Sequence, residues 1–231
     1  MDEDFAYKDT ILKVKCDRDI DEFIKKFIVE KRQELDGYIA RDAQFRISFD
    51  PVAIKKDAPK IARDMAEAAK QAGVGPMAAV AGAVSEHLVE AAKKKGVNWI
   101  IAENGGDISL YGDREFTISI YAGKSPLSGK MGFSLNPAEL DPATKTYGVC
   151  TSSASVGPSI SLGKSDAVTV FAPSATVADA FATAIGNSVN EVEDGLKFAK
   201  RFVGKEIDGV AIIKGDRVGT LGRVPKIVKL V

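Results

Sequence analysis

The chain is short of the residues that most often carry metal and acid–base chemistry. Its 231 residues include one histidine, His87, and two cysteines, Cys16 and Cys150. The cysteines lie far apart and lack the paired spacing of a zinc site. His87 lies within an expected helix beside two glutamates, so a Ser-His-Asp triad is poorly supported. We therefore expect a cytoplasmic protein without disulfides.

Net charge and long apolar runs are also absent. The 32 basic and 32 acidic residues cancel, which gives no reason to expect nucleic acid as a partner. No apolar run approaches the roughly 20 residues of a membrane span, and the acidic start at residues 1–4 is unlike a secretion signal. We expect one domain over residues 1–231 that binds a small molecule, and a homo-oligomer is compatible with this composition.

Hydrophobic periodicity indicates helices and strands that mix without regular alternation, which predicts an α+β fold. Gly112 and Asp113 have the composition of a tight turn and predict a hairpin between their flanking strands. The expected helices are at 20–40, 59–71, 76–95, 175–187 and 190–204, and the expected strands at 7–16, 45–49, 97–102, 107–111, 115–122, 130–135, 146–151, 167–172, 209–214 and 217–221.

The stretch 74–85 consists almost entirely of small residues after a glycine and a proline. Small residues let another backbone or a ligand approach a helix closely. Gly73, Gly75 and Ala78 fit the dinucleotide pattern G-x-G-x-x-A, but a helix precedes them where that motif needs a strand. An anion could still bind at the helix start, so Gly75 and Met77 are predicted ligand contacts.

Two pairs of residues that contain acidic side chains, Asp179 with Thr183 and Glu103 with Asp107, each have a functional and a structural interpretation. Asp179 and Thr183 lie four residues apart on one helix face, and their oxygen ligands suit Mg²⁺ or Ca²⁺. Thr176 and Asp179 equally match a helix capping box. Glu103 and Asp107 flank two glycines at a strand end. The segment is either a loop that contributes to a binding site or a tight turn whose acidic side chains are solvated.

The polar segment between residues 123 and 165 contains two further candidates. Lys164 follows a glycine-rich stretch that is one residue too long for a P-loop. This lysine is predicted to be either a phosphate contact or a solvated loop residue. Cys150 is a buried inert thiol or, near a helix start, a nucleophile with a lowered pKa.

Five motifs in order resemble one family: Val74-Gly-Pro-Met-Ala-Ala-Val-Ala-Gly-Ala, Glu103-Asn-Gly-Gly-Asp-Ile, Ala122-Gly-Lys-Ser-Pro-Leu-Ser-Gly, Cys150-Thr-Ser-Ser and Ala178-Asp-Ala-Phe-Ala-Thr. They look like the uncharacterised ApbE-like family, a divergent branch of the ApbE superfamily of FAD:protein FMN transferases. The resemblance covers nearly the whole chain. It implies an ApbE-like fold in which mixed or antiparallel sheets pack with helices, as two intimate halves around a central site for flavin and magnesium.

The resemblance also implies roles for individual residues. The transferases' Gly-Ala-Ile-Ala-Lys-Gly helix gives a backbone carbonyl to the metal, and the matching position here is Ala78. Their Ala-Asp-Ala-x-x-Thr helix places the other Mg²⁺ ligands on Asp179 and Thr183. Their Gly-Gly-Asp turn near the flavin is similar to Asn104, Gly105, Gly106 and Asp107, so we expect FAD or FMN beside this turn and beside Glu103.

Two departures from the transferases bear on activity. Ala81 stands where they carry lysine, and their His-x-x-Asp-Pro segment has no counterpart, since Pro158 begins the nearest stretch. The implied function is flavin or related phosphorylated-ligand binding with Mg²⁺, as an FMN transferase or a catalytically altered relative. The alternative is an accessory role in sulfide assimilation and homocysteine biosynthesis in anaerobic archaea, acting through Cys150.

Overall fold

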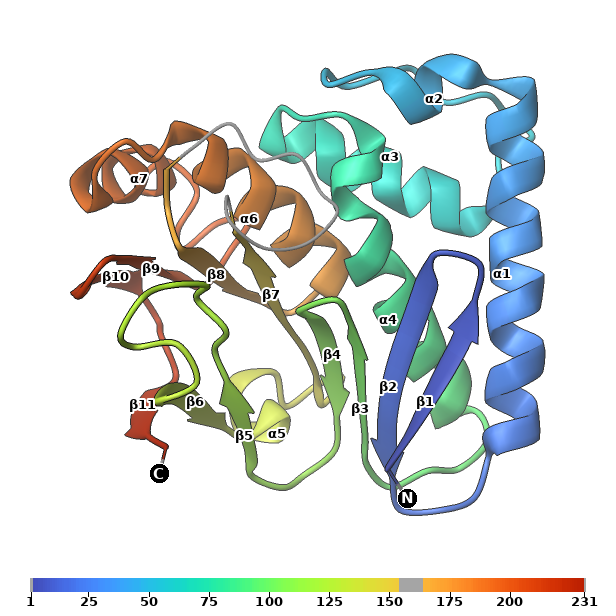
Figure 1. Ribbon diagram of the computed structural model, residues 1–231. Coiled ribbons are helices and arrows are strands. Elements are labelled where there is room, and N and C mark those ends of the chain that lie inside the picture. Colours follow the sequence, from blue (N-terminus) through green and yellow to red (C-terminus); the bar gives the residue numbers. More distant parts are fainter. Residues whose placement is uncertain (1, 154–163, 231) are drawn as a thin grey trace.

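The computed structural model describes residues 2–153 and 164–230, which form two antiparallel sheets and one layer of helices (Figure 1). The eight-stranded sheet has the order β1-β2-β3-β4-β7-β8-β9-β10, and the three-stranded sheet has the order β11-β6-β5. Every strand pair in both sheets is antiparallel. The α+β fold predicted from the sequence is therefore confirmed.

The strands are β1 (Asp2–Tyr7), β2 (Thr10–Cys16), β3 (Ile100–Asn104), β4 (Asp107–Tyr111), β5 (Phe116–Ser119), β6 (Met131–Leu135), β7 (Thr146–Ser152), β8 (Ala167–Ala172), β9 (Gly209–Lys214), β10 (Arg217–Gly222) and β11 (Lys226–Lys229). The helices are α1 (Asp21–Arg41), α2 (Ala43–Ile47), α3 (Lys60–Ala72), the 3₁₀ turn η1 (Pro76–Ala79), α4 (Val80–Lys93), α5 (Pro137–Leu140), α6 (Ala175–Ser188) and α7 (Val192–Ala199).

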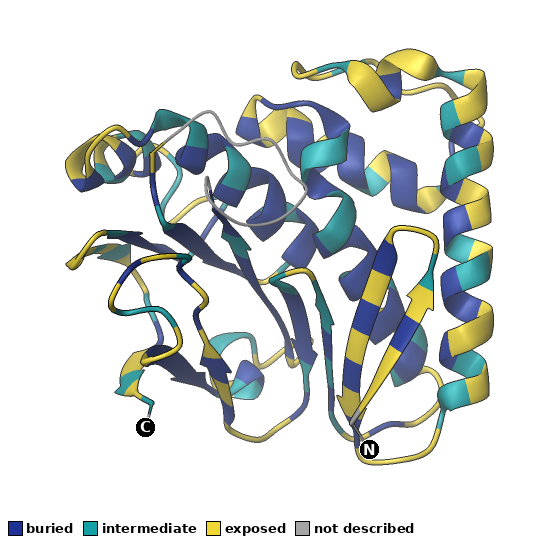
Figure 2. Ribbon diagram, viewed as in Figure 1, coloured by how far each residue is buried: buried dark blue, intermediate teal, exposed yellow. Residues whose placement is uncertain are grey.

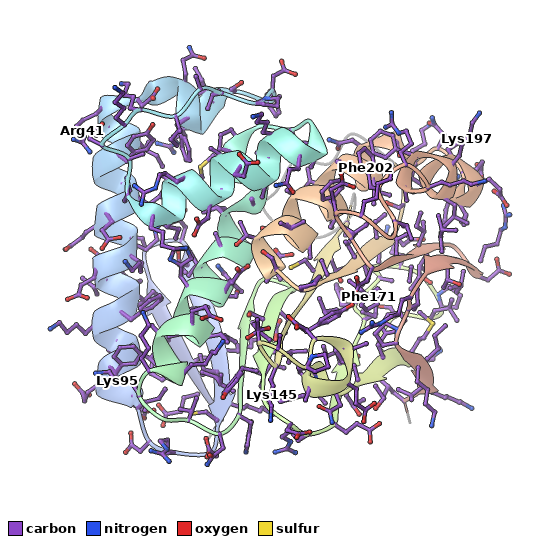
Figure 3. The ribbon with its side chains drawn as sticks, turned by 180° about the vertical axis from the view of Figure 1, so that it is seen from behind. Arg41, Lys95, Lys145, Phe171, Lys197 and Phe202 are labelled. Carbon is purple, nitrogen blue, oxygen red and sulfur yellow. The ribbon has the colours of Figure 1, made fainter. Side chains whose placement is uncertain are left out.

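Side-chain alternation assigns the two faces of the large sheet to different neighbours. In β2, Leu12, Val14 and Cys16 are buried with the helices, whereas Lys13 and Lys15 are exposed on the other face (Figure 2). A second apolar cluster lies between the two sheets and contains Phe133 and Phe171, whose ring centroids are 4.8 Å apart. Figure 3 shows Phe171 inside the molecule, so the large sheet is a wall between two apolar layers.

The structure corrects three expectations about local structure. The expected strand at 45–49 is wrong, because α2 covers Ala43–Ile47; Ile47 and Phe49 are exposed, so the alternating apolar residues do not mark a sheet face. The expected single strand at 7–16 is a β1–β2 hairpin that turns at Lys8, with φ 55°.

The hairpin expected at Gly112 and Asp113 is also wrong. β4 pairs with β3 and β7, while β5 belongs to the three-stranded sheet. The chain therefore changes sheets at this turn, a choice that depends on tertiary pairing and not on turn composition. β11 and α5 were not expected from the sequence.

Candidate functional site

The β3–β4 turn is the element around which the site is built. Asn104 pairs with Asp107, and the two residues between them, Gly105 and Gly106, have φ of 64° and 102°. Positive φ at both central positions of a two-residue hairpin is the geometry that favours glycine. Because side chains alternate along a strand, Asn104 and Asp107 lie on the helix face while Glu103 lies on the opposite face.

Asp179 reaches from α6 to the first turn of α4. Its Oδ2 accepts a hydrogen bond of 2.8 Å from the backbone N–H of Gly82. A Cβ on Gly82 would lie 2.3 Å from the carbonyl oxygen of Ala175 and 2.7 Å from the Cβ of Asp179, so only glycine permits this helix approach. Burial raises the pKa of Asp179 to about 7, although the N–H groups of Gly82 and Ala81 favour its charged form.

Asp107 lies on β4 beneath the same helices. Its backbone oxygen accepts a 2.8 Å hydrogen bond from Ser85 Oγ of α4. Its Oδ1 is buried and has no hydrogen-bond partner in the described part of the chain. Burial, followed by the negative charge of Asp179, raises the pKa of Asp107 well above its ordinary value. The buried carboxyl group of Asp179 and the half-buried carboxyl group of Asp107 thus interact electrostatically across the α4–α6–β4 junction.

Asp179 does not form the capping box that the sequence also allowed. The N-cap of α6 is Ser174, whose side chain accepts from the N–H of Val177. Glu86 Oε2 of α4 accepts from Ser174 Oγ and from the N–H and Oγ1 of Thr176, at 2.7–2.9 Å. A glutamate from another helix therefore caps α6, which leaves Asp179 directed at α4.

Cys150 lies opposite Asp107 in the β4–β7 register and is fully buried. Its thiol donates to the carbonyl oxygen of Ala175 at 3.2 Å. Burial and the negative charges of Asp107 and Asp179 raise the pKa of this thiol well above its ordinary value. The lowered pKa expected of a nucleophile is therefore not found, and Cys150 is an internal hydrogen-bond donor.

The remaining predicted residues are dispersed. Gly75 is buried under the backbone of Ser48, whose oxygen occupies the position of a Cβ at Gly75. Met77 lines a separate cavity of about 480 Å³ beside α1. Lys164 is exposed, and its N–H donates to the oxygen of Val189.

Two further sequence patterns are the glycine-rich stretch before Lys164 and the dinucleotide pattern at Gly73. The glycine-rich stretch before Lys164 includes residues 157–163, which lie outside the described residues, as does Pro158. The dinucleotide pattern at Gly73 follows α3, whose C-cap is Gly73 itself, so the strand that this motif requires is absent from the described structure before it.

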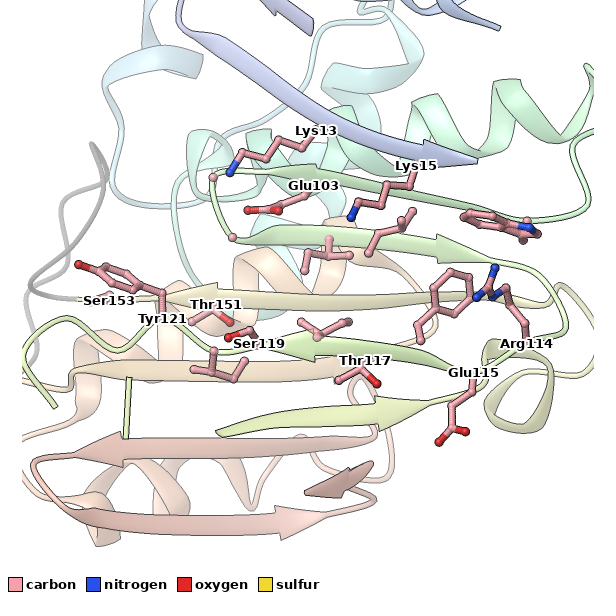
Figure 4. Close-up of a pocket in the computed structure, with 18 residues that line it drawn as sticks. Lys13, Lys15, Glu103, Arg114, Glu115, Thr117, Ser119, Tyr121, Thr151 and Ser153 are labelled. Atoms are coloured by element: carbon pink, nitrogen blue, oxygen red, sulfur yellow. The ribbon is translucent and has the colours of Figure 1, made fainter. Parts of the chain in front are cut away.

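A larger cavity of about 650 Å³ lies on the opposite face of the large sheet (Figure 4). Glu103, Gly105 and Gly106 line it, together with strand β5, but Asp107 does not. Glu103 and Asp107 therefore lie on opposite faces of the large sheet, and the structure does not bring these two acids of the turn together in one cavity. The sequence did not predict this cavity, although the lysines at alternate positions of β2 mark one exposed face of that strand.

The oxygen atoms on the helix face are of the chemical type that a hard divalent cation prefers. Buried carboxylates are normally paired or bound to metal, and the Oδ1 of Asp107 has no partner within the described segments. Asp179 and Thr183 lie on one face of α6, and Ala78, like Thr183, is partly exposed. No group of three His, Cys, Asp or Glu side chains in residues 2–153 and 164–230 is arranged for a metal, so hydroxyl and carbonyl oxygens would have to complete the shell.

Comparison with known proteins shows both family and fold. A family model described as AbpE bacteria matches residues 4–201. The UPF0280 protein of Methanococcus aeolicus is 42% identical over 94% of this chain and 88% of that protein. That of Methanosphaerula palustris is 45% identical over 97% of this chain and 92% of that protein.

The fold is similar to that of a solved flavinyl transferase. The apo form of ApbE from Pseudomonas stutzeri superimposes with a TM-score of 0.62, at 15% identity, over 96% of this chain and 94% of that one. The helices of the described segments are all too short or too polar to cross a membrane.

Proposed function

The chain belongs to the AbpE bacteria family and shares its fold with the ApbE flavin transferases, and from this premise we propose that it binds a flavin or a related phosphorylated ligand together with Mg²⁺. The observation that carries the proposal is the buried carboxyl group of Asp179, bonded to the N–H of Gly82 in the first turn of α4, beside Asp107, whose buried Oδ1 has no hydrogen-bond partner among the described residues. The N-terminal turn of a helix also attracts phosphate.

The proposed ligands of the cation are the carbonyl oxygen of Ala78, the carboxylate of Asp179 and the hydroxyl of Thr183. A bound Mg²⁺ would supply the positive charge that two neighbouring carboxylates and a phosphate require. Asp179 additionally holds the first turn of α4 in place through the N–H of Gly82. Asn104 supports the same turn, since its Nδ2 donates to the oxygen of Ala81 at 3.4 Å.

Binding is better supported than FMN transfer. Transfer needs a base to take the proton of the acceptor hydroxyl, and the only histidine, His87, is 2.7 Å from a carboxylate oxygen of Asp64 on α3. No observation favours the sulfur-handling alternative, because the thiol of Cys150 is buried and its pKa is raised.

Thermal unfolding with FAD and Mg²⁺ tests the proposal. A ligand at 100 times its dissociation constant stabilises a protein by about 2.7 kcal/mol, which for a chain of this size raises Tm by roughly 5–10 °C. We expect this increase for the parent and for Asp216→Asn, an exposed control, but not for Asp179→Asn. If FAD with Mg²⁺ leaves the parent's Tm unmoved, the proposal is wrong.

A further inference from the structure

The cavity beside α1 lies where the β1–β2 turn, α1, α2 and η1 meet. Its volume of about 480 Å³ lies within the roughly 300–1,000 Å³ of small-molecule sites. Met77 of η1, which the sequence predicts as a ligand contact, lines this cavity, and the next residue in the chain is Ala78, a proposed cation ligand. The cavity therefore adjoins the proposed flavin and Mg²⁺ site.

Helix α2 is packed against both α1 and η1, which fixes one wall of the cavity. Phe45 is fully buried, and its ring meets the ring of Tyr38 on α1 edge to face, with centroids 5.1 Å apart. A Cβ at Gly75 would collide with the backbone oxygen of Ser48, so the chain after α2 rests directly on the residue before η1. Arg46 lies between these two contacts and lines the cavity.

The lining of the cavity contains three cations and two carboxylates. Both carboxylates are already paired. Lys8 forms an ion pair with Asp36, and the Nη2 of Arg32 lies 2.6 Å from the Oδ1 of Asp9. Arg46 forms no ion pair with any residue in 2–153 or 164–230, and it is exposed. The cavity therefore has one positive charge in excess, at Arg46.

Arg32 supplies a second guanidinium, whose hydrogen bonds are incomplete. The residue is only 9% exposed, and its Nε is buried without a hydrogen-bond partner in the described part of the chain. Native proteins rarely leave a buried donor unsatisfied. A guanidinium presents its donors in a planar fork that matches the oxygens of a phosphate. Two arginines at one cavity are therefore suited to a phosphate or diphosphate group.

We propose that this cavity binds a phosphate or diphosphate group through Arg46 and Arg32, with Lys8 adding a third positive charge. The group is the anionic part of the phosphorylated ligand, whose remaining part lies beyond Met77 toward the first turn of α4. The inference deepens the proposed function and rests on it for the identity of that remaining part. The phosphate contact itself depends only on the cavity.

Inorganic pyrophosphate, without flavin or Mg²⁺, tests the phosphate contact alone. Calorimetric titration of the parent should show saturable binding. Arg46→Gln should weaken pyrophosphate by about tenfold, the loss expected for a charge-assisted contact. Arg46→Lys keeps the charge but not the planar fork and should recover part of this loss. Arg18→Gln removes an exposed arginine outside the cavity and is the control that should bind like the parent.

Ala40→Glu tests the same cavity without removing a native contact. Ala40 is exposed on α1 and lines the cavity, so the added carboxylate should repel pyrophosphate and weaken it by about fivefold. Gln33→Glu places the same charge at an exposed position of α1 outside the cavity and should leave the affinity unchanged.

FMN and riboflavin, which differ only in the phosphate, connect this contact to the proposed function. With Mg²⁺ present, the fluorescence of each flavin is followed as protein is added. The parent should bind FMN more tightly than riboflavin. Arg46→Gln should reduce this preference by about tenfold and leave the affinity for riboflavin unchanged.

Three results would overturn the inference. The first is a parent that does not bind pyrophosphate, and the second is an unchanged pyrophosphate affinity in Arg46→Gln. The third is an Arg46→Gln variant that keeps the full preference for FMN over riboflavin. A parent that binds pyrophosphate through Arg46, but whose Tm does not respond to FAD with Mg²⁺, would contradict the proposed function and support the phosphate contact.

Discussion

Gly82 and Gly37 are two glycines inside helices for which the structure predicts opposite effects of alanine. In an exposed helix interior, alanine is favoured over glycine by about 1 kcal/mol. Gly37 on α1 is exposed and its added Cβ would meet nothing within 4 Å, so Gly37→Ala should stabilise the protein by about this amount.

At Gly82 the same gain is outweighed by a collision. The added Cβ would lie 2.3 Å from the backbone oxygen of Ala175, an atom that cannot move without shifting α6. Overpacking of a well-packed core costs about 1–3 kcal/mol. We expect the cost of Gly82→Ala to lie at the upper end of this range, because the added Cβ would collide with a backbone atom of α6. After subtraction of the propensity gain, we expect a net loss of about 2 kcal/mol, a difference of roughly 3 kcal/mol from Gly37→Ala.

Urea unfolding followed by far-UV circular dichroism measures both variants, with the midpoint compared at equal m-values. A second readout is the Mg²⁺-dependent shift in Tm, which should fall in Gly82→Ala, because separated helices move Asp179 away from the first turn of α4. If Gly82→Ala were as stable as the parent, the close α4–α6 contact would be wrong, and with it the geometry of the site.

Three further predictions follow from the buried polar groups. The pKa of Asp179 is about 7 in the folded state and near 3.9 in the unfolded state, so between these pH values the folded state binds more protons. Without metal, the free energy of unfolding should therefore fall as pH rises from about 4 to 7. Urea titrations in EDTA should show a weaker decline for Asp179→Asn. Cys150 is fully buried with a raised thiol pKa, so Ellman's reagent at pH 8 should label it only after unfolding, and Cys150→Ala should retain the FAD and Mg²⁺ response; rapid labelling of the native thiol would contradict this. Glu86→Ala removes three hydrogen bonds from the start of α6 and should cost about 2 kcal/mol in urea unfolding, whereas a loss below about 0.5 kcal/mol would contradict a capping role.

The sequence predicts the long periodic elements well and their pairing poorly. α1, α3, α6 and the strands β7 and β8 lie close to their expected bounds, because each has a clear apolar periodicity that its burial satisfies. α2 was mistaken for a strand, since in five residues the alternation of Phe45, Ile47 and Phe49 cannot separate a buried face from exposed apolar side chains.

The candidate site could be predicted only in part for the same reason. Four-residue spacing places Asp179 and Thr183 together on one helix face, a local property. Asp179 contacts the N–H of Gly82, which is 97 positions away in the chain. This contact depends on helix packing, which no local sequence pattern encodes. The capping ambiguity at Thr176 was likewise settled by a distant residue, Glu86.

The β3–β4 turn links two surfaces through its register. Its two central glycines allow Asn104 to pair with Asp107, and this pairing fixes which side chains face the helices and which face the cavity. A shift of one residue reverses every side chain in a strand, so a one-residue shift of β4 would direct Asp107 toward the cavity, while Glu103 on β3 would keep its face. Homologues that keep Asp107 on the helix face should therefore vary this turn by substitution or by paired length changes that preserve the register.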